Sequence, residues 1–270
     1  HTHTHTHTTV HVDTALVYGN QKGVGRALKD SKRSRASYFL TTKIPGGLNA
    51  SATQSSLDQD LAELQVAYVD LMLVHYPCTM DAKQAGGKAS RQAMWRVMEQ
   101  FVKAGKARAI GVSHYCKRHL QDVLDIATVP VSVNQVQFHV GMGHAGPDAT
   151  DNEQFAKDHG ITYQSFSPLC GPCTDAAGNP DRSLITGPLV VGIGRKHNKT
   201  GAQVSLRWQV QQGIPVIPKT DSATHLQQNI DIFDWELDAD DMALLSAATA
   251  PAVAGVGTGV NATSGDCTIA

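Results

Sequence analysis

Four polar side chains, each following an apolar run, are the residues of this sequence best suited to acid–base chemistry. Asp13 and Tyr18 follow the short run VHV, whereas Lys43 and His75 each end a strand-like segment. A phenol is a poor acid near neutrality because its unperturbed pKa is about 10. A neighbouring lysine would lower that pKa, and a carboxylate would keep the lysine charged. These four side chains are therefore a candidate site for proton transfer.

The hydrophobic pattern predicts the elements that would position these side chains. Apolar runs predict strands, and stripes such as Leu57, Leu61 and Leu64 predict the buried faces of helices. Regular alternation of the two predicts a parallel sheet with right-handed crossovers. After a first strand ending at Asp13, the predicted strands are Tyr38–Lys43, Val69–Val74, Ala107–Ser113, Val131–Gln137, Ile161–Ser165 and Pro215–Ile217, and predicted helices include Lys22–Ser31, Leu120–Ala127, Glu153–His159 and Gln203–Gln211.

Periodicity alone does not separate a closed barrel from an open, doubly wound sheet. An open dinucleotide-binding sheet would carry a glycine-rich turn after an early strand, and residues 19–25 lack that fingerprint. In a parallel barrel, functional residues lie at the carboxyl ends of strands. Asp13, Tyr18, Lys43 and His75 fall at or after such ends.

Composition limits the partners of this chain. Its 270 residues include 23 Lys and Arg and 24 Asp and Glu, so there is no excess charge to attract nucleic acid or an anionic membrane. No apolar run approaches the length needed to cross a bilayer, and no signal-peptide pattern opens the chain. We therefore expect a cytoplasmic protein that acts on a small molecule.

Seven segments, taken in order, resemble the aldo-keto reductase superfamily. They are DTALVYGNQKGVGRAL, FLTTKI, YVDLMLVHYP, KAGKARAIGVSHY, VNQVQFH, SFSPL and VIPKTDSATHLQQN. The resemblance extends from about Thr9 to Leu245 and implies a TIM (β/α)8-type parallel barrel. The family's first strand and helix are missing here or replaced by the repeat HTHTHTHT. We therefore expect an arm or cloning scar at 1–8, a barrel domain at 9–250, a tail at 251–270, and a monomer, or a dimer if the barrel is open.

The resemblance also implies an activity, the reduction of aldehydes and ketones to alcohols by hydride transfer from NADPH. Tyr18 matches the general acid, and Lys43 would lower its pKa while Asp13 holds the lysine. His75 would donate a hydrogen bond to the substrate oxygen. Hydride transfer in this scheme needs no metal ion. The aromatic-poor tail does not indicate which carbonyl compound is reduced.

Further positions match the family's cofactor contacts. Ser113 and Gln135 match the residues that bind the nicotinamide carboxamide, and His114 stands where the family has asparagine. Phe166 matches the position that stacks on the ring. His225 replaces an arginine that often binds the 2′-phosphate, so NADH use is also possible. The remaining matches are Ser167 and Leu169 near the pyrophosphate, Lys219, Thr220 and Ser222 at the 2′-phosphate, and Gln228 and Asn229 at the adenine.

Two alternatives to an active reductase remain open at this point. Each of the four polar side chains alone also suits a structural place, such as a helix cap for Asp13 or a core histidine for His75. A chain lacking the first unit could be a catalytically weak or inactive binding or structural protein that keeps the fold, or an incomplete enzyme that dimerises to cover exposed strand edges.

The cysteines and the histidine repeat lie outside the family pattern. Five cysteines exclude a complete set of intrachain disulfides, and reduced thiols are the default expectation. The segment CGPC at Cys170–Cys173 is compatible with a regulatory disulfide, a zinc site or inert thiols. Cys78, Cys116 and Cys267 are also expected near the cleft that holds the candidate site. The alternating histidines of residues 1–8 could also chelate a transition metal.

Overall fold

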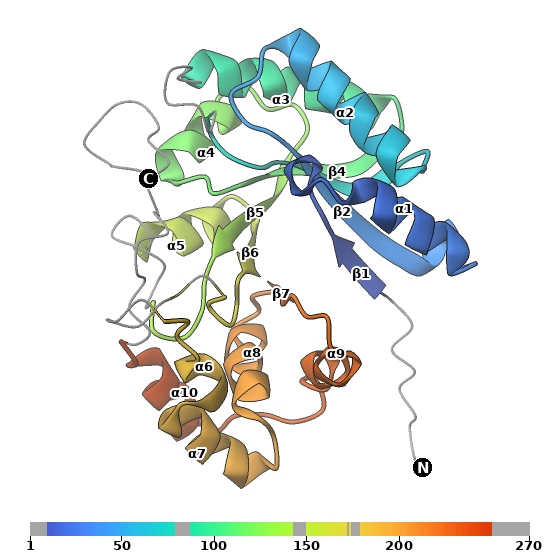
Figure 1. Ribbon diagram of the computed structural model, residues 1–270. Coiled ribbons are helices and arrows are strands. Elements are labelled where there is room, and N and C mark those ends of the chain that lie inside the picture. Colours follow the sequence, from blue (N-terminus) through green and yellow to red (C-terminus); the bar gives the residue numbers. More distant parts are fainter. Residues whose placement is uncertain (1–9, 79–86, 143–149, 172, 174–178, 250–270) are drawn as a thin grey trace. The chain divides into compact units, whose positions relative to one another are not determined.

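The structure is a computed structural model that describes residues 10–78, 87–142, 150–171, 173 and 179–249 (Figure 1). The chain divides into two compact units. The first comprises His1–Ser113 and Arg118–Ser132, and the second comprises His114–Lys117 and Val133–Ala270. The expected terminal segments 1–8 and 251–270 lie outside the described residues.

The first unit contains four parallel strands that pair in chain order. The register aligns Asp13 with Thr41 and Lys43 with Leu73, and the backbone N–H of His75 donates to Ile44 O at 2.9 Å. The strands therefore end at the same edge, which places Asp13, Lys43 and His75 there. The elements are β1 (Val10–Asp13), β2 (Tyr38–Ile44), β3 (Val69–Val74) and β4 (Ala107–Ser113), with α1 (Gln21–Asp30), α2 (Ala50–Leu64), α3 (Lys88–Lys103) and α4 (Lys117–Leu124).

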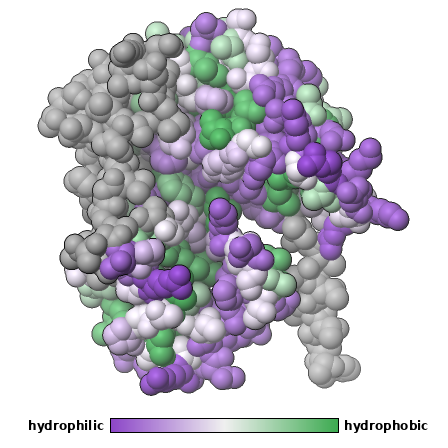
Figure 2. Space-filling view, viewed as in Figure 1, coloured by the Kyte–Doolittle hydropathy of each residue, from purple (hydrophilic) through white to green (hydrophobic). Residues whose placement is uncertain are grey.

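Helices α2 and α3 bury the apolar stripes that the sequence predicts. Leu57 and Leu64 of α2, and Met98 of α3, are almost completely buried. The side chain of Asn49 caps α2 by accepting from the N–H of Ala52 at 2.9 Å. The exposed charged residues of α1 and of the turn that follows it form a hydrophilic surface on the face shown in Figure 2.

A buried carboxylate ties together the amino ends of β2, β3 and β4. Asp70, which is 3% exposed, accepts from Arg35 at 2.5 Å, from the N–H of Leu40 at 2.9 Å and from Arg108 at 3.0 Å. Arg108 also donates to the hydroxyl of Tyr68 at 2.9 Å. Because removing a partner of a buried charge leaves that charge uncompensated and is destabilising, these contacts make Asp70 an anchor at the opposite strand ends from the four candidate residues.

The second unit contains three further parallel strands, again in chain order. Its core includes the ring of Phe138 stacked on Trp208 at 5.4 Å, with Tyr163 edge-on at 5.8 Å. Thr200 and Gln203 form a reciprocal capping box that begins α8. The elements are β5 (Val131–Gln137), β6 (Thr162–Phe166) and β7 (Val216–Ile217), with α5 (Thr150–Asp158), α6 (Ser183–Thr186), α7 (Pro188–His197), α8 (Gly201–Gln211), α9 (Ala223–Ile230) and α10 (Ala239–Ser246).

Three of the predicted strands have both observed bounds, whereas three helices were not predicted. Strands β3, β4 and β5 occupy the predicted ranges, and β6 is shifted by one residue. The unpredicted helices are α6, α7 and α10. Within the described residues, every helix is too short or too polar to cross a bilayer.

Candidate active site

The centre of the candidate site is a buried lysine. The ammonium group of Lys43 contacts the carboxylate of Asp13 and donates to the backbone oxygen of Thr14 at 3.1 Å. The side chain of Lys43 is 0% exposed and that of Asp13 is 12% exposed. Burial lowers the pKa of Lys43, and the charge and hydrogen bond of Asp13 oppose that shift. Asp13 therefore orients the lysine and favours its charged form.

Tyr18 and His75 complete the group of four. Tyr18 ends a short 3₁₀ helix, Leu16–Tyr18, which Gly19 terminates with a positive φ of 64°. The ammonium nitrogen of Lys43 lies 5.4 Å from the centroid of the Tyr18 ring, and the ring of His75 meets that of Tyr18 edge-on at 5.5 Å. His75 in turn stacks on Tyr76 at 4.3 Å. All four predicted side chains therefore gather in the first unit.

The electrostatic environment of Tyr18 differs from the sequence expectation. Burial, followed by the negative charge of Asp13 and then Tyr76, raises its pKa to about 12. The predicted lowering of this pKa by Lys43 is not among the causes of the shift in the protein without cofactor, and it stays a prediction. Just over half of the Tyr18 side chain, 52%, is exposed, so water screens part of the two charge effects.

A buried polar network lies behind the lysine and was missed in the sequence. Gln21 donates to the carboxylate of Asp60, and the hydroxyl of Thr42 donates to Gln21 Oε1 at 2.6 Å. Burial raises the pKa of Asp60 to about 7, and the charge of Asp60 favours the charged form of Lys43. The available signal was an acidic residue on the apolar stripe of α2, beside Leu57 and Leu61.

The predicted nicotinamide positions in the second unit are ordered by local contacts. Gln135 is buried and donates from its amide nitrogen to Gln164 at 2.8 Å. His114 adopts a positive φ of 60°, and its ring lies 4.6 Å from that of Phe166. Ser113 ends β4 in the first unit and is buried.

The predicted phosphate and adenine positions lie in two segments of the second unit. Ser167 follows β6 with a positive φ of 47°, and Leu169 is partly buried two residues later. Thr220 accepts from the N–H of Ser222 at 3.1 Å, and Ser222 caps α9 by accepting from the N–H of His225 at 3.3 Å. Lys219 and His225 are exposed, whereas Gln228 and Asn229 of α9 are partly buried.

Comparisons with known proteins show the family to which this chain belongs. The sequence profile described as "Aldo/keto reductase family" matches residues 5–250. This chain belongs to that family. A glyoxal reductase from Bacillus subtilis is 35% identical over 239 residues, which cover 87% of this chain and 77% of that protein. The chain is therefore an oxidoreductase of the aldo/keto reductase family.

Solved structures show the fold of this family member. An aldo-keto reductase from a Medee basin deep-sea metagenome library has a TM-score of 0.77 at 32% identity, covering 88% of this chain and 81% of that one. An aldo-keto reductase complexed with NADPH has a TM-score of 0.77 at 28% identity, covering 88% of this chain and 73% of that one. The predicted α/β parallel barrel of the TIM type is thus confirmed.

The cysteines do not all behave as the sequence predicts. A disulfide joins Cys170 and Cys173, so the expectation of reduced thiols is wrong for this pair. Cys78 is buried in the first unit, and Cys116 is partly buried in the second. Cys267 lies outside the described residues.

Proposed function

We propose that this protein reduces aldehydes or ketones to alcohols with NADPH as the hydride donor. The observation that carries the proposal is the convergence of Tyr18 and His75 on the ion pair of Lys43 and Asp13, at the carboxyl ends of β1, β2 and β3. An acid, a fixed cation and a hydrogen-bond donor are the groups that a carbonyl needs as its oxygen gains charge.

Each residue has a distinct role in the proposed reaction. NADPH, when bound, supplies the hydride to the carbonyl carbon. Tyr18 donates its proton to the carbonyl oxygen, and His75 donates a hydrogen bond that orients this oxygen. Lys43 lies beside the phenol, so its positive charge stabilises the phenolate left after proton transfer, and Asp13 fixes the lysine.

The second unit has residues that suit NADPH. The first turn of α9 is capped by Ser222 and offers backbone N–H groups and a positive helix end, both of which favour a phosphate. The exposed Lys219 precedes it and supplies a cation for the 2′-phosphate. Phe166, half-buried at the end of β6, suits one face of the nicotinamide, and Gln135 suits its carboxamide. These residues are the proposed cofactor contacts together with Ser113, His114, Ser167, Leu169, Thr220, His225, Gln228 and Asn229.

Purified protein should be titrated with NADPH by fluorescence and then assayed for NADPH oxidation with a panel of aldehydes and ketones that includes dicarbonyls. We expect binding and turnover in the wild type, and a loss of turnover of at least about 100-fold in Tyr18→Phe with NADPH binding retained. Because removing the phenolic hydroxyl eliminates the proton donor without changing the ring, kcat should fall and the Kd for NADPH should not.

Tyr68→Phe is the matched control. It removes the same hydroxyl group at the amino end of β3, where Tyr68 contacts Arg108, and turnover should be unchanged. Binding of NADPH without reduction of any carbonyl by the wild type would favour the alternative, a binding protein that keeps the fold. Equal activity of Tyr18→Phe and wild type would refute the assignment of the acid.

A further inference from the structure

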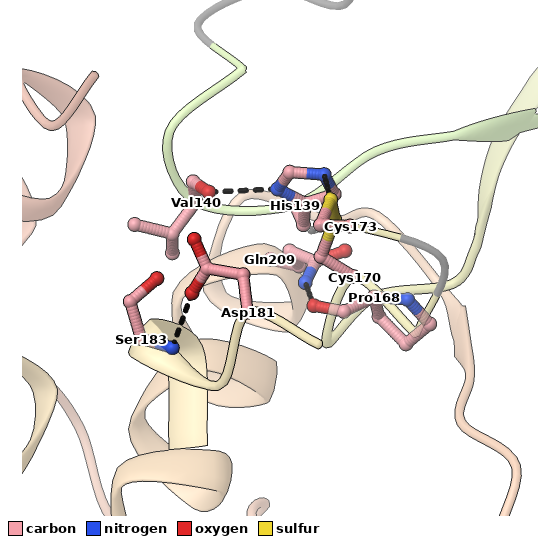
Figure 3. Close-up of a disulfide and its surroundings, with 8 residues drawn as sticks. All are labelled: His139, Val140, Pro168, Cys170, Cys173, Asp181, Ser183 and Gln209. Carbon is pink, nitrogen blue, oxygen red and sulfur yellow. Dashed lines mark hydrogen bonds between the residues drawn. A yellow bond between two sulfur atoms is a disulfide. The ribbon is translucent and has the colours of Figure 1, made fainter. Parts of the chain in front are cut away.

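The second unit contains a buried cluster of one imidazole and two sulfur atoms that the proposed reduction does not use. His139 follows β5, and Cys170 and Cys173 lie in the turn that follows β6 (Figure 3). Their ligand atoms all lie within 4.8 Å of one another. We propose that, once the disulfide is reduced, His139, Cys170 and Cys173 form a Zn²⁺ site.

The hydrogen bonding of His139 prepares it to bind a metal. Its Nδ1 lies 2.8 Å from the backbone oxygen of Val140. Because a carbonyl oxygen only accepts, Nδ1 carries the proton, and the lone pair is therefore on Nε2. Metal-binding histidines characteristically donate their other ring N–H to a carbonyl or carboxylate in this way. Nε2 is also the ring nitrogen that faces the sulfur of Cys173.

The spacing between the imidazole and the sulfur fits zinc. Nε2 of His139 and Sγ of Cys173 are 3.7 Å apart. With Zn–S near 2.3 Å and Zn–N near 2.0–2.1 Å, tetrahedral geometry places nitrogen and sulfur ligands about 3.6 Å apart and two sulfur ligands about 3.8 Å apart. Cleaving the disulfide therefore allows the sulfurs to reach ligand spacing while the histidine stays in place.

The turn that holds the cysteines is fixed by its own backbone. The N–H of Cys170 donates to Ser167 O at 2.8 Å, and the N–H of Cys173 donates to Cys170 O at 3.1 Å. The side chain of Gln209 on α8 donates to Pro168 O at 3.0 Å and anchors the start of the turn (Figure 3). These hydrogen bonds fix the backbone at Cys170 and at Cys173, whose sulfurs lie close enough to share one ion.

Burial favours metal binding over thiol exchange with a partner protein. His139, Cys170 and Cys173 are 0%, 1% and 2% exposed. Exchange requires in-line attack on a sulfur atom by another thiolate, and a buried pair resists this attack. A zinc ion bound by two thiolates and a neutral imidazole carries no net charge, so the buried site needs no additional carboxylate, and water can take the fourth position.

Reduction of the disulfide and binding of Zn²⁺ can each be written as a balanced step. A phosphine transfers two electrons to the disulfide and breaks the S–S bond, and one water supplies the oxygen of the phosphine oxide and the protons of the two thiols. Zn²⁺ then displaces both thiol protons to solvent, while neutral His139 contributes a lone pair without losing a proton. Hydrogen peroxide can take two electrons from the dithiolate, which forms the S–S bond, gives two hydroxide ions and releases the metal ion.

Cobalt and zinc titrations of the full chain test the proposal. The protein is reduced with a phosphine, freed of reductant without oxygen, and titrated with Co²⁺, which reports thiolate ligation by a sulfur-to-metal charge-transfer absorption. We expect this band to saturate at about one equivalent per chain and to disappear when Zn²⁺ is added. The oxidised wild type should show no such band. Zn²⁺ should also raise the unfolding temperature of the reduced protein only.

Three sets of variants identify the ligands. The band should be lost in Cys170→Ser and in Cys173→Ser, and weakened in His139→Asn. It should persist in Cys78→Ser and Cys116→Ser, and in a variant whose four histidines in residues 1–8 are replaced by alanine. Absence of the band in reduced wild-type protein would overturn the proposal. An equal response of the oxidised and reduced proteins would overturn it as well, and that comparison needs no variant to fold.

Discussion

At the scale of single residues, the phenol of Tyr18 is a weaker acid in the cofactor-free protein than in water. Its pKa is raised to about 12 by burial and by Asp13 and Tyr76. A proton donor is active below its pKa, so Tyr18 stays protonated across neutral and mildly alkaline pH. We expect kcat/KM for NADPH, at a fixed carbonyl concentration, to show no alkaline decline between about pH 6 and 9, because this parameter reports ionisation in the enzyme before the cofactor binds.

Initial-rate measurements across that pH range check the expectation. If Lys43 instead lowered the pKa of Tyr18 below 9 in the free enzyme, an alkaline limb would appear. The profile of Tyr68→Phe should coincide with that of the wild type, since its hydroxyl contacts Arg108 at the other end of β3.

Asp60 has a folded-state pKa of about 7, well above its unfolded value of about 3.9. The folded state therefore binds more protons than the unfolded state between these values, and the free energy of unfolding falls as pH rises from about 4 to 7. Asp60→Asn keeps the oxygen that accepts from Gln21 but does not titrate. The free energy of unfolding of this variant should fall less steeply between about pH 4 and 7, so the difference in its favour over the wild type should be largest above pH 7.

Urea unfolding at several pH values measures this difference. Asp58→Asn is the matched control in the same helix, because Asp58 is an exposed partner of Lys106 whose carboxyl pKa is lowered. If Asp60→Asn and the wild type lost stability in parallel between pH 4 and 7, Asp60 would not be the titrating group.

The arrangement of the parallel strands explains why the sequence indicates the four candidate residues. Parallel strands end at one edge, so a polar residue closing each of β1, β2 and β3 meets the others there. The raised pKa of Tyr18 did not follow, because it depends first on how far the folded chain buries the phenol and then on the charge of Asp13. His139 was also missed as a neighbour of the cysteines, since 30 residues separate it from Cys170 and only the pairing of β5 with β6 brings them together.

At the scale of elements, helices α1 and α2 contact each other through a glycine. A Cβ added at Gly25 would lie 2.6 Å from the backbone oxygen of Leu64 and 2.8 Å from that of Glu63, at the end of α2. Backbone atoms cannot move aside as a flexible side chain can. Gly25→Ala should therefore destabilise the protein by roughly 1–3 kcal/mol, measured as a lower urea midpoint.

Gly23 provides an internal control in the same helix. A Cβ there would meet only Arg26, at 3.9 Å. Gly23→Ala should raise the free energy of unfolding by about 0.5–1 kcal/mol, because alanine loses less conformational freedom on helix formation. Similar changes in both variants would show that helix propensity, and not the contact with α2, determines the response at Gly25.

The unpredicted helices α10 and α7 differ in the strength of their helix signals in the sequence. Helix α10 has a clear start, since Asp238 caps it by accepting from the N–H of Asp241 at 2.8 Å and acidic residues occupy its first turn. Helix α7 contains Gly192 and Gly194, which weaken any helical pattern. A Cβ at Gly194 would meet the backbone oxygen of Lys199, so tertiary packing requires glycine where helix propensity opposes it.

At the scale of the whole molecule, cofactor binding should stabilise the fold. A ligand that binds only the folded state adds RT ln(1 + [L]/Kd), about 2.7 kcal/mol at a hundredfold excess over Kd. We expect NADPH to raise the unfolding temperature more than NADH at equal concentration, because the exposed Lys219 and the start of α9 favour the additional phosphate.

Thermal unfolding with each cofactor, in the wild type and in two lysine variants, measures this preference. Lys219→Ala should reduce the difference between NADPH and NADH, whereas Lys106→Ala, which removes an exposed partner of Asp58, should leave it unchanged. Equal stabilisation of the wild type by both cofactors would show that the 2′-phosphate is not recognised.

The Asp70 anchor has a consequence for how this enzyme can acquire new substrates. Asp70 joins Arg35, Leu40 and Arg108 at the amino ends of the strands, whereas the reactive side chains occupy the carboxyl ends. Insertions and substitutions in the segments leaving β1, β2 and β3 therefore leave this anchor intact. Evolution, or a randomised library, can therefore vary substrate selectivity at the carboxyl ends of these strands while the contacts of Asp70 at the amino ends maintain the fold.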